Sequence, residues 1–466
     1  MSAVGAPLAS TLPSSSTIVL GAIAAVIAIG ALAFLMRRYE DALPLLAILA
    51  LPFRVPISLE SKTVNLLIPL YLVVAAGTLT RLLPAVLLRR RTGPDEAARE
   101  DRGRLLGGWR SLELWSSPRM LEATLLGAVV LYALQGIYSA DHARAAENVV
   151  FFYVPFALLF LLLRDVTWRR ELLIRCLGVA VALAVVFAGI GFVEYARKSL
   201  FLNPKVVAAH QYDNYFRVNS LFFDPNIYGR FLALVMIALA TVVLWSRQRR
   251  EVLLGAAALT WLLGGLITSF SQSSIAALLL GLAVLAAWRW DLRRTIYTSF
   301  AVVAIAGAVV LLAPTSLHFG LKGSSGSTSN ATSGRTKLIS GGVELFAKRP
   351  VQGFGSGSFE REYKSHSETT AENATSASHT IPVTVAAEQG VIGLVLYVAL
   401  LISGMLVLFR GAGRSPPRIA LAACLAALLL HTWTYADFLE DPFTWAILAI
   451  GVALARQARA EQPSSF

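Results

Sequence analysis

His379 lies where a polar stretch of the chain meets a long apolar run. Residues 377–394 read ASHTIPVTVAAEQGVIGL, so the imidazole is at the edge of a segment that can enter a bilayer. An ionisable side chain is costly to bury at such an edge, and it is therefore either hydrated at the membrane surface or held there for chemistry. The function of the chain depends on which of these holds.

Five other histidines compete with His379 for a chemical role. Four lie in polar stretches or short polar connections, where we expect them to be solvated: His142, His210, His318 and His366. The fifth, His431, lies inside an apolar run beside Trp433 and Tyr435, a setting that favours a hydrogen-bonded histidine of the core or of a cavity. His379 is thus the histidine best placed for chemistry.

An arginine precedes a strong helix-start signal in the connection that ends NYFRVNSLFFDPNIYGRFLAL. Asp224 is a typical N-cap residue, Pro225 fits the first helical position, and Asn226 follows. Arg217 stands seven residues before Asp224, just outside the expected bilayer. Because a helix N-terminus favours anions, Arg217 and this helix start could hold an anion together. The alternative is that Arg217 contacts lipid headgroups or Asp213.

Three glycines follow Pro350 at alternate positions, Gly353, Gly355 and Gly357. Glycine tolerates tight turns and close backbone approach, so a bend is expected here. A turn of this kind is more often structural than a cradle for an anion, and both interpretations stay open.

The composition indicates that a membrane scaffold presents these residues. Of 466 residues, 56% are hydrophobic and only 15% are charged, and the mean hydropathy is +0.64. This combination lies outside the range of soluble domains. Each apolar run of about 20 residues can cross about 30 Å of hydrocarbon as a helix, which satisfies its own backbone hydrogen bonds. We therefore expect an all-α protein with many membrane spans.

The number of spans depends on one doubtful run, 42–55, which is short and broken by Pro44 and Pro52. Treating it as a half-span gives about twelve spans and a cytoplasmic N-terminus, and leaves Arg37 and Arg38 on the unexpected side. Treating it as a crossing gives thirteen spans and an outer N-terminus, and we expect twelve. The apolar runs are 18–36, 42–55, 64–88, 120–138, 149–163, 172–195, 227–245, 252–268, 275–288, 295–313, 381–409, 419–435 and 443–454.

Basic clusters fall on alternate connections between the runs, which places those connections in the cytoplasm. They are residues 89–91, 164 with 169–170, 247–250, 289–294 and 410–418. On the opposite side two connections are long, 196–224 and 314–380, and we expect function there. Within the longer one, residues 335–348 carry apolar positions at helical spacing and predict an amphipathic helix.

This pattern divides the chain into an N-terminal transmembrane bundle (1–313), a large outer loop (314–380), and C-terminal transmembrane helices with a short cytoplasmic tail (381–466). The first part includes a charged cytoplasmic loop at 89–119. The net charge of +13 resides in the topogenic clusters and does not indicate nucleic-acid binding. Cys176 and Cys424 lie inside apolar runs, so neither a disulfide framework nor a metal site is expected. The uncharged start lacks the basic region of a cleavable signal peptide, so the first span is expected to stay.

The residues from His379 onward resemble the signature of the bacterial O-antigen ligase family. His379 and Thr380 are followed by nine residues, Gly390, two residues and Gly393, and the family pattern is His, then Asn, Ser or Gln, nine residues and Gly-x-x-Gly. A wider resemblance covers residues from about 120 to 455 and extends to O-antigen polymerases and protein O-oligosaccharyltransferases. It includes the block from Arg217 to Asn226, the pair Gly334-Arg335 and the glycine turn after Pro350.

Two positions depart from the family pattern. Thr380 stands where Asn, Ser or Gln is usual, which keeps a hydroxyl but not an amide. Gln272, between Ser271 and Ser273, stands where the family commonly carries an arginine, so one expected cation is missing at that connection.

The resemblance implies a glycosyltransferase of the Gram-negative inner membrane with a periplasmic active site and no cofactor or metal. Its donor would be a polysaccharide on undecaprenyl diphosphate, and its acceptor lipid A–core oligosaccharide. Such a reaction needs cations beside the leaving diphosphate and a base for the attacking hydroxyl. Arg217 and Arg335 match the first role and His379 the second. Supporting roles are expected from Asn226, Gly353, Gly355 and Asp437.

Three alternatives stay open. Within the superfamily, the chain could be an O-antigen polymerase or a protein O-oligosaccharyltransferase. A polysaccharide transporter or flippase would also need many spans, but transporters tend to show inverted repeats and midplane charges, and the sequence contains neither signal. The acidic residues Asp437, Glu440 and Asp441 follow a predicted span; one could orient His379 or bind sugar hydroxyls, or all could be a solvated helix end.

Overall fold

The computed structural model describes residues 15–59, 62–84, 115–201, 216–290, 293, 327–366, 380–435 and 437–461. Their regular secondary structure is helical apart from one two-stranded β-hairpin. The chain forms two compact units, Met1–Pro94 and Asp95–Phe466. These units do not follow the topological divisions 1–313, 314–380 and 381–466, which stay predictions.

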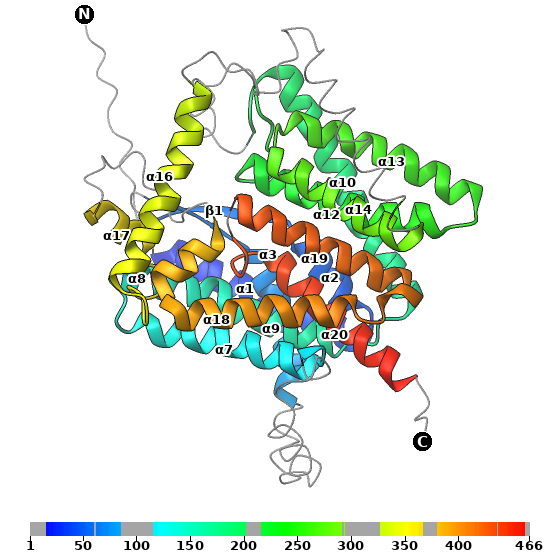
Figure 1. Ribbon diagram of the computed structural model, residues 1–466. Helices are drawn as coiled ribbons and strands as arrows, with labels where there is room; N and C mark the ends of the chain where they lie inside the picture. The colour runs from blue at the N-terminus through cyan, green and yellow to red at the C-terminus, as the bar shows by residue number, and fades with distance from the viewer. Residues whose placement is uncertain are drawn as a thin grey trace, which may run out of the picture. The chain divides into compact units, whose positions relative to one another are not determined.

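The described residues of the first unit form the elements α1 (Ser15–Arg38), α2 (Ala42–Ala50), β1 (Val55–Leu59), β2 (Lys62–Leu66), α3 (Ile68–Gly77) and a π-helical turn at Thr78–Leu82. α1 packs on α3, and β1 pairs antiparallel with β2 (Figure 1). α2 has 9 residues and, at about 1.5 Å per residue, covers less than half of the hydrocarbon thickness. It is therefore the short helix that the two prolines of 42–55 predicted.

Two predicted spans have different boundaries in the structure. The run 64–88 does not begin as a helix, because Val64 and Leu66 pair with β1 and the helix starts only at Ile68. The run 149–163 starts earlier than predicted, since the helix that contains it begins at His142. His142 is exposed, as expected, and its Nδ1 lies 2.9 Å from the carbonyl oxygen of Gly136.

The second unit contains the remaining helices: α7 (Pro118–Gly136), α8 (His142–Asn148), a π-helical turn (Val149–Tyr153), α9 (Val154–Arg164), α10 (Arg170–Arg197), α12 (Pro225–Trp245), α13 (Arg249–Thr268), α14 (Gln272–Arg289), α16 (Ser327–Lys348), α17 (Phe359–His366), α18 (Ile381–Phe409), α19 (Pro416–Thr434) and α20 (Pro442–Ala460). In the described part of the chain, 8 helices are long and apolar enough to cross a membrane. This confirms the all-α polytopic class. The total of twelve or thirteen stays a prediction, because the run 295–313 lies outside the described residues.

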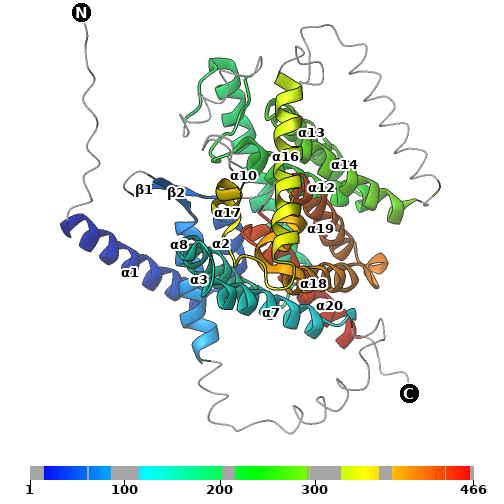
Figure 2. The ribbon, with the colours of Figure 1, turned by 60° about the vertical axis from the view of Figure 1, so that its left-hand side comes forward.

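α12 is the most enclosed of these candidate spans, with 78% of its apolar window buried. It packs on α10, α13, α14 and α19 (Figures 1 and 2). Its start is the one that the sequence predicted: the Asp224 side chain accepts a hydrogen bond from the N–H of Asn226 at 2.6 Å, and Pro225 occupies the first turn. The central helix therefore carries candidate site residues directly at its N-terminus.

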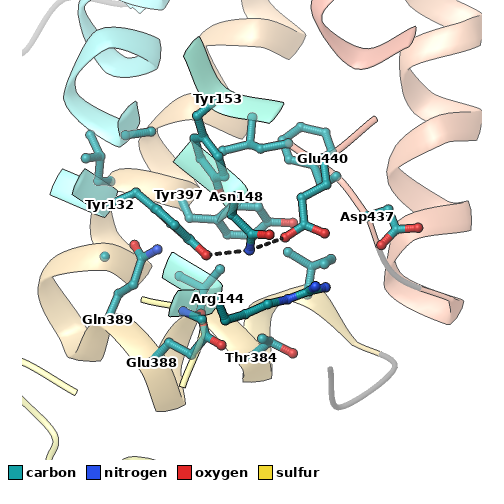
Figure 3. Close-up of a pocket in the computed structure, with 18 of the residues that line it drawn as sticks. Tyr132, Arg144, Asn148, Tyr153, Thr384, Glu388, Gln389, Tyr397, Asp437 and Glu440 are labelled. Atoms are coloured by element: carbon teal, nitrogen blue, oxygen red, sulfur yellow. Dashed lines mark hydrogen bonds between the residues drawn. The ribbon is translucent and has the colours of Figure 1, made fainter. Parts of the chain in front are cut away.

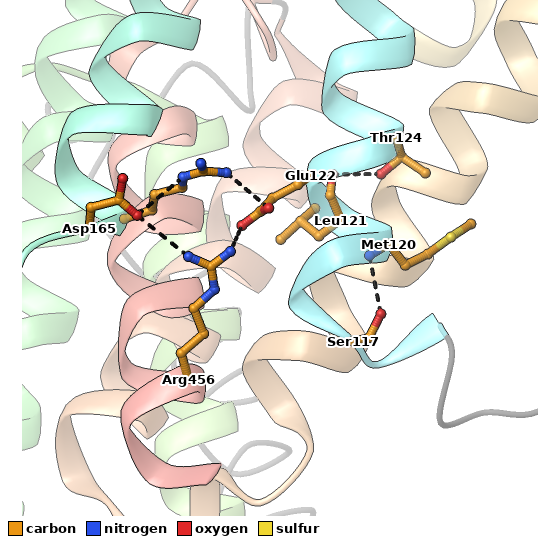
Figure 4. A network of polar contacts seen from close by, with 8 residues as sticks. Ser117, Met120, Leu121, Glu122, Thr124, Asp165 and Arg456 are labelled. Atoms are coloured by element: carbon orange, nitrogen blue, oxygen red, sulfur yellow. Dashed lines mark hydrogen bonds and ion pairs between the residues drawn. The ribbon is translucent and has the colours of Figure 1, made fainter. Parts of the chain in front are cut away.

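An ionic network joins α7, α9 and α20 at one end of the second unit (Figure 4). Glu122 pairs with Arg164 at 2.9 Å and also with Arg456, and Asp165 lies 3.5 Å from both arginines. The start of α7 therefore meets the ends of α9 and α20. The later half of α7, the first half of α18 and the connection before α20 instead line a polar cavity.

α16 confirms the amphipathic helix predicted over 335–348, although it begins at Ser327. It packs steeply across the first half of α18 (Figures 1 and 2). Its side chains Leu338 and Leu345 are buried, and they form an apolar cluster with Phe354, Phe359, Tyr363 and Ala387. α17 was not predicted; it contains His366, which is exposed as expected and has Nδ1 2.9 Å from the carbonyl oxygen of Glu362.

Candidate active site

Arg217 lies beside the start of α12 and is fixed there by two hydrogen bonds. Its Nε donates to the carbonyl of Ser269 at 3.2 Å, and its Nη2 donates to Oδ1 of Asn226 at 3.2 Å. The side chain is half-buried. The structure thus brings together two of the residues selected from the sequence, and it holds the guanidinium in one orientation.

Serines at the start of α14 extend this contact to α19. Oγ of Ser271 donates to Oδ1 of Asn226 at 2.9 Å and lies 2.7 Å from Oγ of Ser274. Nε2 of His431 lies 3.1 Å from Oγ of Ser274 and 3.3 Å from Oγ of Ser273. His431 is fully buried, which agrees with its interpretation as a histidine of the core or of a cavity; Nε2 is hydrogen-bonded, whereas Nδ1 has no partner among the described residues.

A buried ion pair fastens α12 to the start of α20. Nε of Arg230 lies 3.1 Å from Oδ2 of Asp441, and the two side chains are only 2% and 1% exposed. Asp441 also caps α20 by accepting the N–H of Phe443 at 3.2 Å. Removing one partner of a buried pair typically costs about 3–5 kcal/mol. Asp441 therefore has a structural task and differs from the neighbouring Asp437 and Glu440.

The helix α18 is broken at Gly390, whose φ of 64° and ψ of −162° are not helical. The turn after α16 fills the break with backbone hydrogen bonds: Val391 N–H donates to the carbonyl of Pro350 at 2.7 Å, and Gly355 N–H to that of Glu388 at 2.8 Å. A Cβ at Gly390 would collide with the turn backbone. Glycine is therefore required at this position by both conformation and space.

The three-glycine turn is a structural bend. Gly353, Gly355 and Gly357 have φ values of 67°, 95° and 74°, which L-residues with a Cβ rarely adopt. The N–H groups of Gly357 and Phe359 donate to the carboxylate of Glu388 at 2.9 and 3.0 Å. Donors that could have cradled an external anion are thus occupied by a side chain of α18.

A polar cavity of about 100 Å³ lies between α7, α8, the first half of α18 and the connection before α20 (Figure 3). Because one water needs about 10–15 Å³ on this measure, the cavity has room for several waters or for one small polar molecule. Nδ2 of Asn148 donates to the hydroxyl of Tyr132 at 2.7 Å and to Oε1 of Glu440 at 3.0 Å. The polar and aromatic lining of the cavity includes Tyr132, Arg144, Asn148, Tyr153, Thr384, Glu388, Gln389, Tyr397, Asp437 and Glu440.

The hydrogen-bond network that runs from Arg217 through Asn226 to His431 comes close to the cavity at the last turn of α19. His431 on this turn ends the network, and Trp433 two residues later donates from Nε1 to the hydroxyl of Tyr397, a cavity residue, at 3.1 Å. Thr380 Oγ1 donates to the carbonyl of Trp433 at 3.4 Å. Thr380 therefore anchors the start of α18 where the two polar regions meet, and it directly follows His379 in the chain.

The remaining predicted site residues have various positions. His379 lies outside the described residues, and of Arg335 only the backbone, within α16, is described. Gln272 is exposed. Asp437 lines the cavity with a left-handed backbone, φ 69°. The two histidines His210 and His318 also lie outside the described residues.

Sequence reasoning missed most of the cavity. Tyr132 and Asn148 lie in or beside apolar runs, and only tertiary packing brings them to Glu440. Glu388 did carry a readable signal, because an ionisable residue inside an apolar run is rarely without a task. Its task here is to hold the glycine turn.

The described helices define a polytopic helical membrane protein, and polar groups gather at one end of the bundle in its second unit. Residues 256–398 match the family model described as O-antigen ligase. Over these residues the match confirms the resemblance seen in the sequence, and it supports the O-antigen ligase superfamily. The matched segment contains Arg335, His379 and the glycine turn, whereas Arg217 and Asn226 precede it. No curated protein matches the chain.

Proposed function

We propose that this chain is an inner-membrane glycosyltransferase that transfers O-antigen polysaccharide en bloc from undecaprenyl diphosphate to a hydroxyl of lipid A–core oligosaccharide on the periplasmic face. The observation that carries this proposal is the O-antigen ligase match over residues 256–398. The family implies a polysaccharide donor and a lipid acceptor in general. The particular donor, acceptor and side of the membrane are parts of the proposal.

In the proposed reaction the acceptor hydroxyl attacks the anomeric carbon of the donor sugar. The bond between that carbon and the phosphate oxygen breaks, and undecaprenyl diphosphate leaves with the bonding electrons. His379 accepts the proton of the attacking hydroxyl, while Arg217 and Arg335 stabilise the charge that develops on the diphosphate. Arginine suits this task because its planar fork matches phosphate oxygens and stays charged.

The contacts of Arg217 support its assigned role. Its bonds to Ser269 and Asn226 use two N–H groups of the five that a guanidinium carries, and the side chain is only half-buried. The start of α12 adds its positive dipole end beside the guanidinium. A preorganised cation of this kind stabilises a transition state without reorganising at the moment of reaction.

A deletion strain distinguishes the members of the superfamily. Lipopolysaccharide without O-chains, together with long carrier-linked polymer on the outer side of the membrane, is the expected result for a ligase. Lipopolysaccharide capped with single repeat units would instead identify a polymerase. Retention of the polymer in the cytoplasm would identify a transporter. Normal O-chains on lipopolysaccharide would refute the ligase proposal.

The diphosphate role is tested in purified protein by measuring donor binding and transfer separately. Arg217→Ala and Arg335→Ala should weaken both, because a phosphate cation acts in the ground state and in the transition state. Lysine at either position should restore only part of the loss, since it keeps the charge but not the fork. Arg250→Ala is the matched control, an exposed arginine at the start of α13. Unchanged donor affinity in both arginine variants would refute the diphosphate role and favour the alternative that Arg217 and Arg335 contact lipid headgroups.

A further inference from the structure

The polar cavity beside α8 contains groups that the proposed transfer does not use. Asn148 is only 3% exposed and lines the cavity. Its Nδ2 is bonded to Tyr132 and Glu440, but its Oδ1 has no hydrogen-bond partner among the described residues. A buried acceptor without a partner is costly, and in a native protein it calls for an explanation. An external hydroxyl donor would satisfy it.

The charges around the cavity select against phosphate. One guanidinium faces the cavity together with five carboxylic side chains, namely Arg144 against Asp141, Glu360, Glu388, Asp437 and Glu440. Arg144 already pairs with Glu147 at 3.3 Å. A diphosphate would therefore meet net repulsion here, whereas hydroxyl groups can donate to carboxylates without a charge penalty.

The walls of the cavity suit a ring-shaped ligand. Tyr132 stacks on Tyr153 with ring centroids 4.2 Å apart, and Tyr397 completes the aromatic lining. A site with aromatic walls and a few fixed polar groups is the usual design for binding and orienting a small organic ligand. Asp437 adds a carboxylate that forms no hydrogen bond with any other described residue, and Figure 3 shows it at the edge of the cavity beside Glu440.

We propose that this cavity is a subsite for an uncharged sugar ring, whose hydroxyls bond to Asn148, Asp437 and Glu440 against the wall of Tyr132. The subsite rests on the proposed function and adds to it the part of the substrate that is not diphosphate. The cavity lies next to the point where Thr380 meets α19, because Trp433 contacts both Thr380 and the cavity residue Tyr397. Both the donor glycan and the acceptor core contain such rings.

Two pairs of lipids identify which ring is bound. The first pair is undecaprenyl diphosphate with and without its oligosaccharide, and the second is lipid A with and without core sugars. Affinities are measured for the wild type, Asn148→Ala, Asp437→Asn and the control Thr124→Val, a buried α7 hydroxyl that contacts Ser403 and does not line the cavity. Thermal melting in detergent reports the fold of each variant.

We expect the wild type to prefer the glycosylated member of one pair, and both cavity variants to reduce that preference about tenfold while the control keeps it. Loss in the first pair assigns the ring to the donor, and loss in the second assigns it to the acceptor. Preferences within twofold of the wild type in both pairs would overturn the subsite. If Asn148→Ala does not fold, Asp437→Asn decides, because it changes only the charge of a half-buried side chain. Absence of transfer by the wild type with an intact sugar preference would refute the proposed function and leave the subsite standing.

Discussion

The contact between Arg217 and Asn226 offers a test in which stability and function move in opposite directions. The substitution Asn226→Asp keeps the shape of the side chain and replaces its amide with a carboxylate 3.2 Å from the guanidinium of Arg217. Asn226 lies in the first turn of α12, where a negative charge stabilises the helix by about 0.3–1 kcal/mol. The variant should therefore fold at least as well as the wild type.

Donor binding should nevertheless become weaker. The new carboxylate partly neutralises the cation proposed to hold the diphosphate, and it also repels that diphosphate. If Arg217 loses one hydrogen bond to the diphosphate, the cost is that of a bond to a charged group, about 1.5–3 kcal/mol, or roughly 10–150-fold in the Kd of the donor. The dissociation constant for undecaprenyl diphosphate and the melting temperature are measured on the same purified sample.

Asn226→Ala is the companion variant. It removes the acceptor of Arg217 and of Ser271 without adding charge, so it should lower the melting temperature and weaken donor binding less than the aspartate does. A well-folded Asn226→Asp protein that binds undecaprenyl diphosphate as tightly as the wild type would refute the assignment of Arg217 as a diphosphate cation.

Three further outcomes are expected. His379→Ala should leave donor affinity nearly unchanged and lower turnover by about 10²–10⁴-fold, the usual range for a positioned acid–base group; near-normal transfer would remove the base assignment. Gly353→Ala should lower the melting temperature sharply, because φ is 67° and a Cβ would collide with the Glu388 carbonyl, whereas Gly21→Ala, with nothing within 4 Å, should not; equal melting temperatures would contradict the close backbone contact. Single cysteines introduced within 314–380 should react with a membrane-impermeant thiol reagent in intact spheroplasts, and labelling only after lysis would reverse the orientation.

Signals that are local in the sequence predicted local structure correctly. The triplet from Asp224 to Asn226 fixed the start of α12, since an N-cap and a first-turn proline act within one helical turn. The apolar spacing around Leu338 and Leu345 predicted α16, because the same spacing determines which face is buried. The two prolines of 42–55 predicted a short helix, because a proline also acts within one helical turn.

Features that depend on packing between distant segments could not be predicted. Hydropathy alone made 64–88 a span, yet pairing with β1 draws Val64 and Leu66 into a strand. Gly353 predicted a bend and Gly390 was only part of the family signature, so neither indicated that a turn and a broken helix would share their hydrogen bonds. Arg217 and Asn226 could be paired from their proximity in the chain. The partnership of Asn148 with Glu440 spans 292 positions and has no periodic signal.

The joint between α18 and the glycine turn limits how the site can open. A broken helix leaves amide and carbonyl groups that hydrocarbon cannot satisfy, and here the segment around Pro350 and Gly355 satisfies them. Pulling that segment away would expose these groups at a cost of several kcal/mol each. The joint is therefore expected to stay closed when other parts of the second unit move. If the proposed lipid-linked donor and acceptor need such a movement to enter, we expect the contacts between α18 and the glycine turn to be kept during it.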